Sequence, residues 1–275
     1  MRSRRRWTAG AAAAAALAMI GAKANAQGGT ADARGGAANA QGGAANAQGG
    51  GGTAQGGPNT KAGANAQGGA ANATLRVCTF GDSVLDCARY NERGIDPGRL
   101  IVRNDDALFP EFAGRDLSAR GPARLEHRAV DGATVDDLAG QARGLQRAEP
   151  SIALVTIGGN DLLRGLAAEG RGIARFEATL AAFVRDLPVS RVVLGTVYDP
   201  TFGDDARNFL GVPAAVARAN HRKVNDVIRA IAARHGGLAD IHAHFLTGDP
   251  SWYTRTIEPS LVGASEVRRV FLAVI

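Results

Sequence analysis

The sequence is poor in cysteine. Its 275 residues include two, Cys78 and Cys87. Cys78 falls in a predicted strand, and Cys87 lies one turn beyond Ser83, which follows that strand. Strand and helix diverge from the turn between them, so a disulfide is not expected. We interpret both thiols as small buried apolar side chains. The cysteines therefore say little about the redox compartment.

A strong surplus of charge and a rich supply of aromatic residues are also missing. Lys and Arg total 32 against 26 Asp and Glu, which gives a net charge of +6, and aromatic residues make up 5% of the chain. No basic stripe alternates with aromatic side chains, so nucleic-acid binding is not expected. His242 and His244 form a His-x-His pair, but no further ligand cluster accompanies them. We predict no metal and no cofactor.

The first 26 residues resemble an export signal without a membrane span. Arginines occupy four of the first six positions, an apolar stretch covers residues 9–22, and Ala24-Asn25-Ala26 offers a cleavage site. The stretch is too short to cross a bilayer comfortably. No cysteine follows it, which excludes a lipoprotein anchor. We expect a secreted or periplasmic protein if this signal is real, and a cytoplasmic one otherwise.

Residues 27–73 lack large apolar side chains. The unit Ala-Ala-Asn-Ala-Gln-Gly-Gly occurs twice in tandem, at 37–43 and 44–50. Such a segment has nothing to bury that would offset the entropy lost on ordering. We predict a disordered linker without a catalytic role. The folded domain is then expected at 74–275.

Short apolar runs alternate with helical patterns through this domain. Strands are predicted at 75–80, 124–130, 151–157, 191–197 and 237–241. Helical patterns lie near 83–90, 134–147, 160–168, 172–186, 213–235 and 263–272. Strands that alternate with helices indicate a parallel sheet with right-handed crossovers and helices on both faces. We predict an α/β fold, a three-layer α/β/α sandwich around a five-stranded parallel sheet.

Three apolar runs end in turns that carry chemistry. The first ends in Gly81-Asp82-Ser83, a later one in Gly158-Gly159-Asn160-Asp161, and Gly132 follows a run between them. The carboxyl ends of parallel strands meet at one edge of a sheet, so we expect these turns to converge there. Each also has a purely structural explanation, because serine and asparagine cap helices and glycine forms ordinary turns.

These blocks, in this order and spacing, resemble the SGNH (GDSL-type) hydrolase family from about Leu75 to the end of the chain. The resemblance implies a flavodoxin-like fold and a serine hydrolase that cleaves carboxylic esters. It implies Ser83 as the nucleophile. It also implies an oxyanion hole made by the backbone N–H groups of Ser83 and Gly132 and by the side chain of Asn160. Such fixed donors stabilise the charge that develops on the ester oxygen.

Four further residues beside these turns are candidates for substrate binding: Asp82, Asp161, Tyr198 and Asp199. The first two adjoin the serine and the asparagine. The other two open a loop after the fourth predicted strand, where a loop is placed to shape a pocket. Asp161 also suits a helix cap, and Asp199-Pro200 also suits a plain turn.

The fourth block departs from the family. Arg255 and Glu258 stand where the family has aspartate and histidine. A glutamate with a pKa near 4.3 is about two units less basic than imidazole near 6.5, although burial raises a carboxyl pKa. Glu258 is one candidate base for Ser83. His244 is the other, because His242 and His244 end the fifth predicted strand and share one of its faces.

Two functions remain open at this point. The leading prediction is an esterase that acts on a small-molecule ester through Ser83. The alternative is a catalytically impaired domain on the same scaffold, which binds an acyl or carbohydrate ligand without cleaving it. The altered fourth block motivates this alternative.

Overall fold

The computed structural model describes residues 73–275. The export signal predicted for residues 1–26 lies outside this part of the chain, as does the linker predicted for 27–73 apart from its last residue. Among the helices of the described part, none is long and apolar enough to cross a bilayer.

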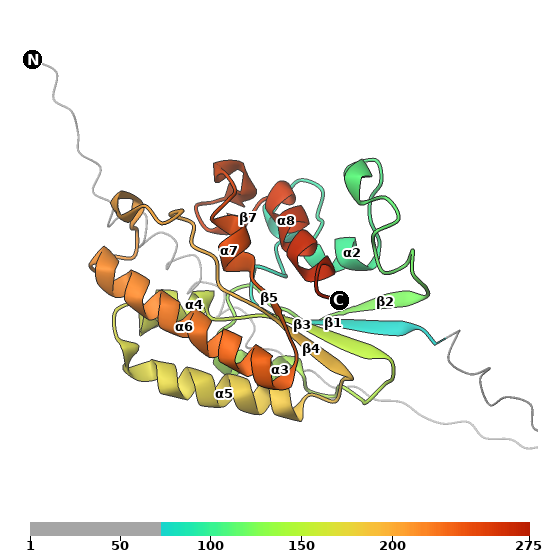
Figure 1. The fold of residues 1–275 in the computed structure, drawn as a ribbon, viewed down its shortest axis with the longest axis horizontal. Helices are drawn as coiled ribbons and strands as arrows, with labels where there is room; N and C mark the ends of the chain where they lie inside the picture. Colours follow the sequence, from blue (N-terminus) through green and yellow to red (C-terminus); the bar gives the residue numbers. More distant parts are fainter. Residues whose placement is uncertain (1–72) are drawn as a thin grey trace, which may run out of the picture.

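A sheet of five parallel strands forms the centre of the described residues (Figure 1). Its strand order is β2-β1-β3-β4-β5, which is the flavodoxin-like order. The predicted fold class is therefore confirmed. The strands are β1 (Leu75–Gly81), β2 (Ala123–His127), β3 (Ser151–Thr156), β4 (Arg191–Gly195) and β5 (Gly237–Ala239). Because β1 and β3 are neighbours, the turns that carry Ser83 and Asn160 lie at the same edge.

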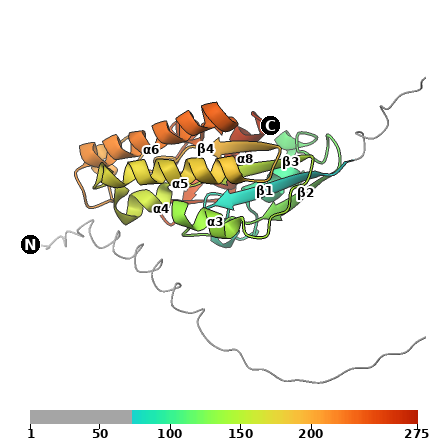
Figure 2. The same ribbon diagram turned by 90° about the horizontal axis from the view of Figure 1, so that it is seen from below.

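Helices cover both faces of the sheet (Figure 1). One face carries α3 (Leu138–Gln141), α5 (Ile173–Asp186) and α6 (Ala214–His235). The other carries α2 (Pro97–Val102), α7 (Ile241–Phe245) and α8 (Leu261–Leu272). Figure 2 shows α5 and α6 side by side. Side chains of β1 alternate between the two layers: Cys78 and Phe80 pack in the core under α5 and α6, and Val77 in the core under α7 and α8.

Short elements connect these layers. A three-residue helix, α4 (Gly159–Asp161), continues into the π-helix η4 (Leu162–Leu166). A small antiparallel pair joins β6 (Tyr253–Thr254) to β7 (Glu258–Pro259). The 3-10 helices are η1 (Ala88–Tyr90), η2 (Pro110–Phe112), η3 (Val135–Asp137), η5 (Gly170–Gly172), η6 (Asp205–Arg207) and η7 (Pro250–Trp252).

Three predicted elements are wrong in detail. The helix predicted near 83–90 is a turn followed by η1 alone. Leu85 and Cys87, two residues apart, are both fully buried, and an α-helix would point such residues to different sides. The helix predicted for 134–147 shrinks to η3 and α3. The strand predicted for 237–241 ends at Ala239, because the Asp240 side chain accepts a hydrogen bond from Ala243 N (3.2 Å) and caps α7.

Gly81 fixes how the nucleophile turn leaves the sheet. Its φ is +116°, and a Cβ built there would lie 1.6 Å from the carbonyl oxygen of Thr156 on β3. The Gln141 side chain holds the same residue, with Oε1 accepting from Gly81 N (2.7 Å) and Nε2 donating to Gly81 O (2.8 Å). A side chain at this position must therefore push β1 and β3 apart.

We predict that Gly81→Ala lowers the free energy of unfolding by more than about 3 kcal/mol, because strain and a backbone clash combine. Gly114→Ala is the matched control, since Gly114 also has a positive φ (+69°) but no atom within 4 Å of the new Cβ. It should cost about 1–2 kcal/mol. Urea unfolding of both variants measures the difference. Equal losses would mean that the contact with Thr156 is not the constraint.

Candidate active site

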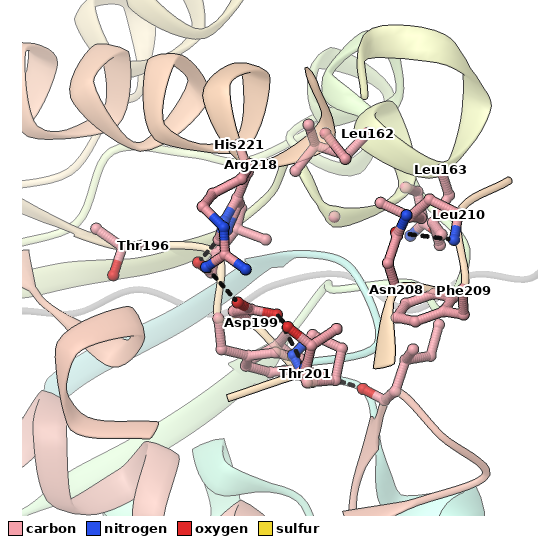
Figure 3. Close-up of a pocket in the computed structure, with 18 of the residues that line it drawn as sticks. Leu162, Leu163, Thr196, Asp199, Thr201, Asn208, Phe209, Leu210, Arg218 and His221 are labelled. Atoms are coloured by element: carbon pink, nitrogen blue, oxygen red, sulfur yellow. Dashed lines mark hydrogen bonds and ion pairs between the residues drawn. The ribbon is translucent and has the colours of Figure 1, made fainter. Parts of the chain in front are cut away.

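The carboxyl edge of the sheet holds a cavity of about 130 Å³. Five of the predicted site residues line it: Asp82, Ser83, Asn160, Tyr198 and Asp199. They come from the turns after β1, β3 and β4, so the predicted convergence occurs. Figure 3 shows part of this cavity, with Asp199 among its labelled residues. Gly132, Asp161, Glu258 and His244 are not among the lining residues and need separate description.

Asp82 is buried and stabilises the turn that carries Ser83. Its Oδ1 accepts from Val84 N (3.2 Å) and from Thr156 Oγ1 (3.0 Å), which ties the turn to the end of β3. Burial raises the pKa of Asp82 to about 7, the hydrogen bonds oppose this, and the nearby carboxylates of Glu258 and Asp161 add to it. Its hydrogen bonds thus hold the turn that presents Ser83.

Asn160 connects two of the predicted blocks. Its side chain is 6% exposed, and Nδ2 donates to Ala133 O (3.0 Å). The N-cap of α4 is Gly158, so Asn160 does not cap this helix. An amide nitrogen carries two hydrogens, and the bond to Ala133 uses one of them. The second is the one that a substrate oxyanion in the cavity would need.

The segment with Gly132 is anchored to the turns on either side of it. Val130 N donates to Gly81 O (2.9 Å), Asp131 N donates to Asp86 Oδ2 (2.8 Å), and Gly132 O accepts from Arg164 (2.9 Å). Gly132 has φ +83°, which favours glycine. These bonds hold Gly132 between the serine turn and the helix that carries Asn160.

The Asp161 side chain bonds to the segment that follows Gly132. Its two carboxylate oxygens accept from Val135 N (3.2 Å each), at the start of η3. Burial raises the pKa of Asp161 to about 6, against the effect of these bonds. Asp161 thus ties α4 to the start of η3.

Glu258 lies close to Ser83. It is 9% exposed, and its Oε2 is buried without a hydrogen-bond partner in residues 73–275. Burial raises the pKa of Glu258 to about 7, while a hydrogen bond from the Ser83 side chain lowers it. A pKa near neutrality means that the Glu258 carboxyl exchanges its proton at physiological pH.

Glu258 reaches this place through a strained turn. Thr254 pairs with Glu258 across β6 and β7, and two of the three residues between them, Arg255 and Thr256, have φ +47° and +78°. Positive φ is unfavourable for residues other than glycine. Such strain persists only where the surrounding structure enforces it.

Cations near Glu258 oppose the effect of burial. Arg89 and Arg255 both lower the pKa of Glu258, whereas Asp131 raises it. Arg255 is exposed and stacks on the ring of Tyr90 (5.2 Å), and Tyr90 donates to Asp131 Oδ2 (2.7 Å). Arg89 pairs with Asp131 (3.0 Å). Arg89 and Tyr90 were not among the residues predicted from the sequence, where their place six and seven residues after Ser83 was the available signal.

His244 is placed differently from its prediction. It lies on α7 and not on a strand, so His242 and His244 do not share a strand face. Its Nε2 bonds to Glu266 Oε2 (2.7 Å) on α8, and its ring lies 5.1 Å from that of Trp252. Among the histidines of the described residues, His221 is the one that lines the cavity.

Tyr198 and Asp199 shape the cavity wall. The Tyr198 hydroxyl donates to Ile257 O (2.5 Å), next to Glu258, and its ring stacks on Phe245 (5.0 Å between centroids). Asp199 accepts from Thr201 N (2.9 Å) and Gly203 N (3.1 Å) and so folds the loop. Both residues act on the shape of the site through these bonds.

Metal ligands are not clustered in this region. Over residues 73–275, no group of three or more His, Cys, Asp or Glu side chains is arranged to hold an ion.

A serine turn after β1, a Gly-Gly-Asn-Asp turn after β3 and a flavodoxin-like sheet define a hydrolase scaffold of the SGNH class. The chain belongs to the GDSL-like lipase/acylhydrolase family, whose model matches residues 79–262. A search of the curated proteins found no match.

Solved structures share the fold. An α/β hydrolase enzyme from the metagenome of Lake Arreo, Spain, is 25% identical, with a TM-score of 0.53 over 74% of this chain and 95% of that one. An acetylxylan esterase from Geobacillus stearothermophilus is 22% identical, with a TM-score of 0.53 over 74% and 94%. A lipolytic protein of the G-D-S-L family from Veillonella parvula is 18% identical, with a TM-score of 0.50 over 74% and 98%.

The buried carboxyl of Asp82 predicts a pH dependence of stability. The folded protein keeps a proton on Asp82 up to about pH 7, whereas the unfolded chain releases it near pH 4. The contribution of Asp82 to stability is therefore fully present at low pH and is lost as the pH rises from about 4 to 7.

We expect Asp82→Asn to remove part of this fall, about 2–4 kcal/mol between pH 5 and pH 8. Urea unfolding at both pH values measures it. Asp226→Asn, an exchange of an exposed aspartate on α6, should keep the wild-type difference. A fall in Asp82→Asn as large as in the wild type would contradict the burial effect.

Proposed function

We propose that the protein hydrolyses carboxylic esters with Ser83 as its nucleophile and Glu258 as its general base. The observation that carries this proposal is a buried carboxyl at Glu258, with a pKa raised to about 7 by its burial, that lies near enough to Ser83 for the serine side chain to lower that pKa. Family membership and the esterase among the structural neighbours support the same reaction class.

The reaction begins when Ser83 Oγ attacks the ester carbonyl. Its proton passes to ionised Glu258, and the carbonyl oxygen gains negative charge. The free amide hydrogen of Asn160 and the backbone N–H groups of Ser83 and Gly132 stabilise that charge. When the tetrahedral intermediate collapses, Glu258 returns the proton to the departing alcohol, and an acyl group remains on Ser83.

Hydrolysis of this acyl-enzyme repeats the sequence with water. Glu258 takes a proton from the water as it attacks, and the proton then returns to Ser83 as the acid departs. A base with a pKa near 7 suits both directions of transfer at neutral pH. Burial gives the glutamate the basicity that an exposed carboxyl lacks.

Arg255 and Glu258 reverse the charges of the pair that the family has in these positions. With histidine as base, an aspartate stabilises the protonated imidazole. With glutamate as base, a cation instead stabilises the ionised base. Arg255 and Arg89 fill this role, because both lower the pKa that burial raises. The family's aspartate beside Glu258 would have the opposite effect.

A fluorophosphonate that acylates activated serines tests the nucleophile. We expect the wild type to be labelled at Ser83 and Ser83→Ala to remain unlabelled. Glu258→Gln should lose about 10²–10⁴-fold in turnover of p-nitrophenyl butanoate, since it removes the general base. His244→Ala should keep most of the turnover.

The comparison of the two variants separates the candidate bases. A loss in His244→Ala as large as that in Glu258→Gln would transfer the role to His244. Absence of both labelling and turnover in folded wild type would instead favour the alternative function, a domain that binds an acyl or carbohydrate ligand without cleaving it.

The cation beside the base predicts a pH effect. Arg255→Gln removes a positive charge, so the pKa of Glu258 rises and the acid limb of kcat/KM moves to higher pH. A profile from pH 5 to pH 9 measures the shift. Arg93→Gln, which removes another exposed arginine, is the matched control. An acid limb that stays in place or moves to lower pH would show that Arg255 does not act on the base.

A further inference from the structure

We propose that the cavity beyond Ser83 binds the acyl chain of the substrate and selects esters of unbranched aliphatic acids longer than acetyl. This inference rests on the proposed function and adds the substrate class to it. Ser83 and Asn160 line the same cavity as a set of apolar side chains. An acyl group on Ser83 therefore has this space directly beside it.

Apolar side chains from two segments form the wall of the cavity. Leu162 and Leu163 come from η4, and Phe209 and Leu210 come from the segment between β4 and α6. Figure 3 shows Leu163 and Leu210 next to each other, with Asn208 and Phe209 beside them and Leu162 above the cavity. Leu163, Phe209 and Leu210 are only partly buried, so they keep apolar surface that a chain would cover. Burial of this surface favours a hydrocarbon ligand.

Most polar side chains that line the cavity already form hydrogen bonds within the protein. Arg218 donates to Gly203 O (2.8 Å), and the His221 ring bonds through Nε2 to Val197 O (2.8 Å). Thr196 Oγ1 donates to Asp240 Oδ1 (2.9 Å).

The same holds for the loop residues around them. Asp199 accepts from the backbone of the loop that it folds, and Thr201 Oγ1 donates to it (2.6 Å). Asn208 Nδ2 donates to Val212 O (2.6 Å).

These internal bonds argue against a sugar in this cavity. A sugar hydroxyl would have to displace existing hydrogen bonds, and a displaced buried partner costs free energy. An aliphatic chain needs no polar partner and leaves all these bonds in place. The cavity therefore favours an acyl chain, and the alcohol part of the ester is left to the outer side of Ser83, toward Arg255.

The backbone around η4 supports a cavity built for a ligand. The π-helix interrupts the regular helix that the Gly-Gly-Asn-Asp turn begins, and Gly165 inside it has φ +133°. Such single-turn π-helices are frequent at functional sites. Here the π-helix carries two leucines to the cavity wall.

The first test is the chain-length dependence of kcat/KM for p-nitrophenyl acetate, butanoate, hexanoate, octanoate and dodecanoate. Each buried methylene contributes about fourfold at most. We expect kcat/KM to rise several-fold per step of two carbons above acetate, and then to fall when the chain exceeds the cavity. Acetate as the best substrate would overturn the inference.

The second test fills the cavity. Leu163→Trp should lower the octanoate-to-acetate ratio of kcat/KM by about tenfold or more, since it removes space for several methylenes. Leu246→Trp, at an exposed leucine on the other side of the sheet, is the matched control and should keep the wild-type ratio. Leu163→Ala should move the best chain length upward. An unchanged ratio in Leu163→Trp together with an unchanged best length in Leu163→Ala would overturn the inference.

The third test does not depend on turnover. Calorimetry of Ser83→Ala with octanamide and acetamide compares a long and a short neutral acyl analogue. Octanamide should bind at least tenfold more tightly, and Leu163→Trp introduced into Ser83→Ala should reduce this preference. Equal binding of the two amides, in a protein whose wild type turns over esters, would overturn the acyl pocket and leave the proposed function standing. Preferential binding of octanamide without any turnover or labelling would support the pocket and reject the hydrolase.

Discussion

The site depends on the close contact of β1 and β3 at Gly81. Thr156 O lies where a side chain of residue 81 would have to be, and Asp82 N donates to the same oxygen (3.1 Å). Directly after this contact the buried carboxyl of Asp82 bonds back to Thr156. The two strands therefore fix the turn at its root, and Ser83 leaves the sheet in one direction. These contacts stabilise the turn after β1 without helical hydrogen bonds, and no α-helix forms there.

Burial and charge act in opposite directions on the proposed base. Burial alone would hold Glu258 in its protonated form, which cannot accept the serine proton. Arg89 and Arg255 lower the pKa of Glu258 in part, and it lies near neutrality. The arginine at 255 and the glutamate at 258 therefore depart from the family pattern as a matched pair. A nearby cation stabilises the ionised form of a glutamate base, as a nearby anion stabilises the protonated form of a histidine base. The pair of Arg255 and Glu258 therefore supports the proposed catalysis.

The cavity combines an apolar wall with polar residues that are hydrogen-bonded to other parts of the protein. This arrangement separates two kinds of polar group at one sheet edge. In the proposed reaction, the side chains of Ser83 and Asn160 interact with the substrate. The side chains of Asp199 and Arg218 instead form hydrogen bonds with the backbone of the loop. Similarity of fold to an acetylxylan esterase does not carry over to such details, because loops between strands vary while the sheet is kept.

Several features followed from the sequence alone. The apolar runs and their alternation with helical patterns determined the five-stranded parallel sheet, because a strand that is buried on both faces consists of a nearly continuous run of apolar residues. The glycines and polar residues after those runs determined which turns meet at its edge. For Ser83, Asn160, Tyr198 and Asp199 this was enough to place all four around one cavity.

Other features were decided only by the tertiary structure. The helix at 241–245 replaces a predicted strand end because Asp240 caps it, and this moves His244 toward Glu266. The pKa of Glu258 depends on its burial and on Arg89, which is distant in the sequence. The hydrogen bonds that occupy Asp199, Arg218 and His221 likewise join residues from separate segments. Local pattern determines elements and their order, but desolvation and pairing arise between segments that only the folded chain brings together.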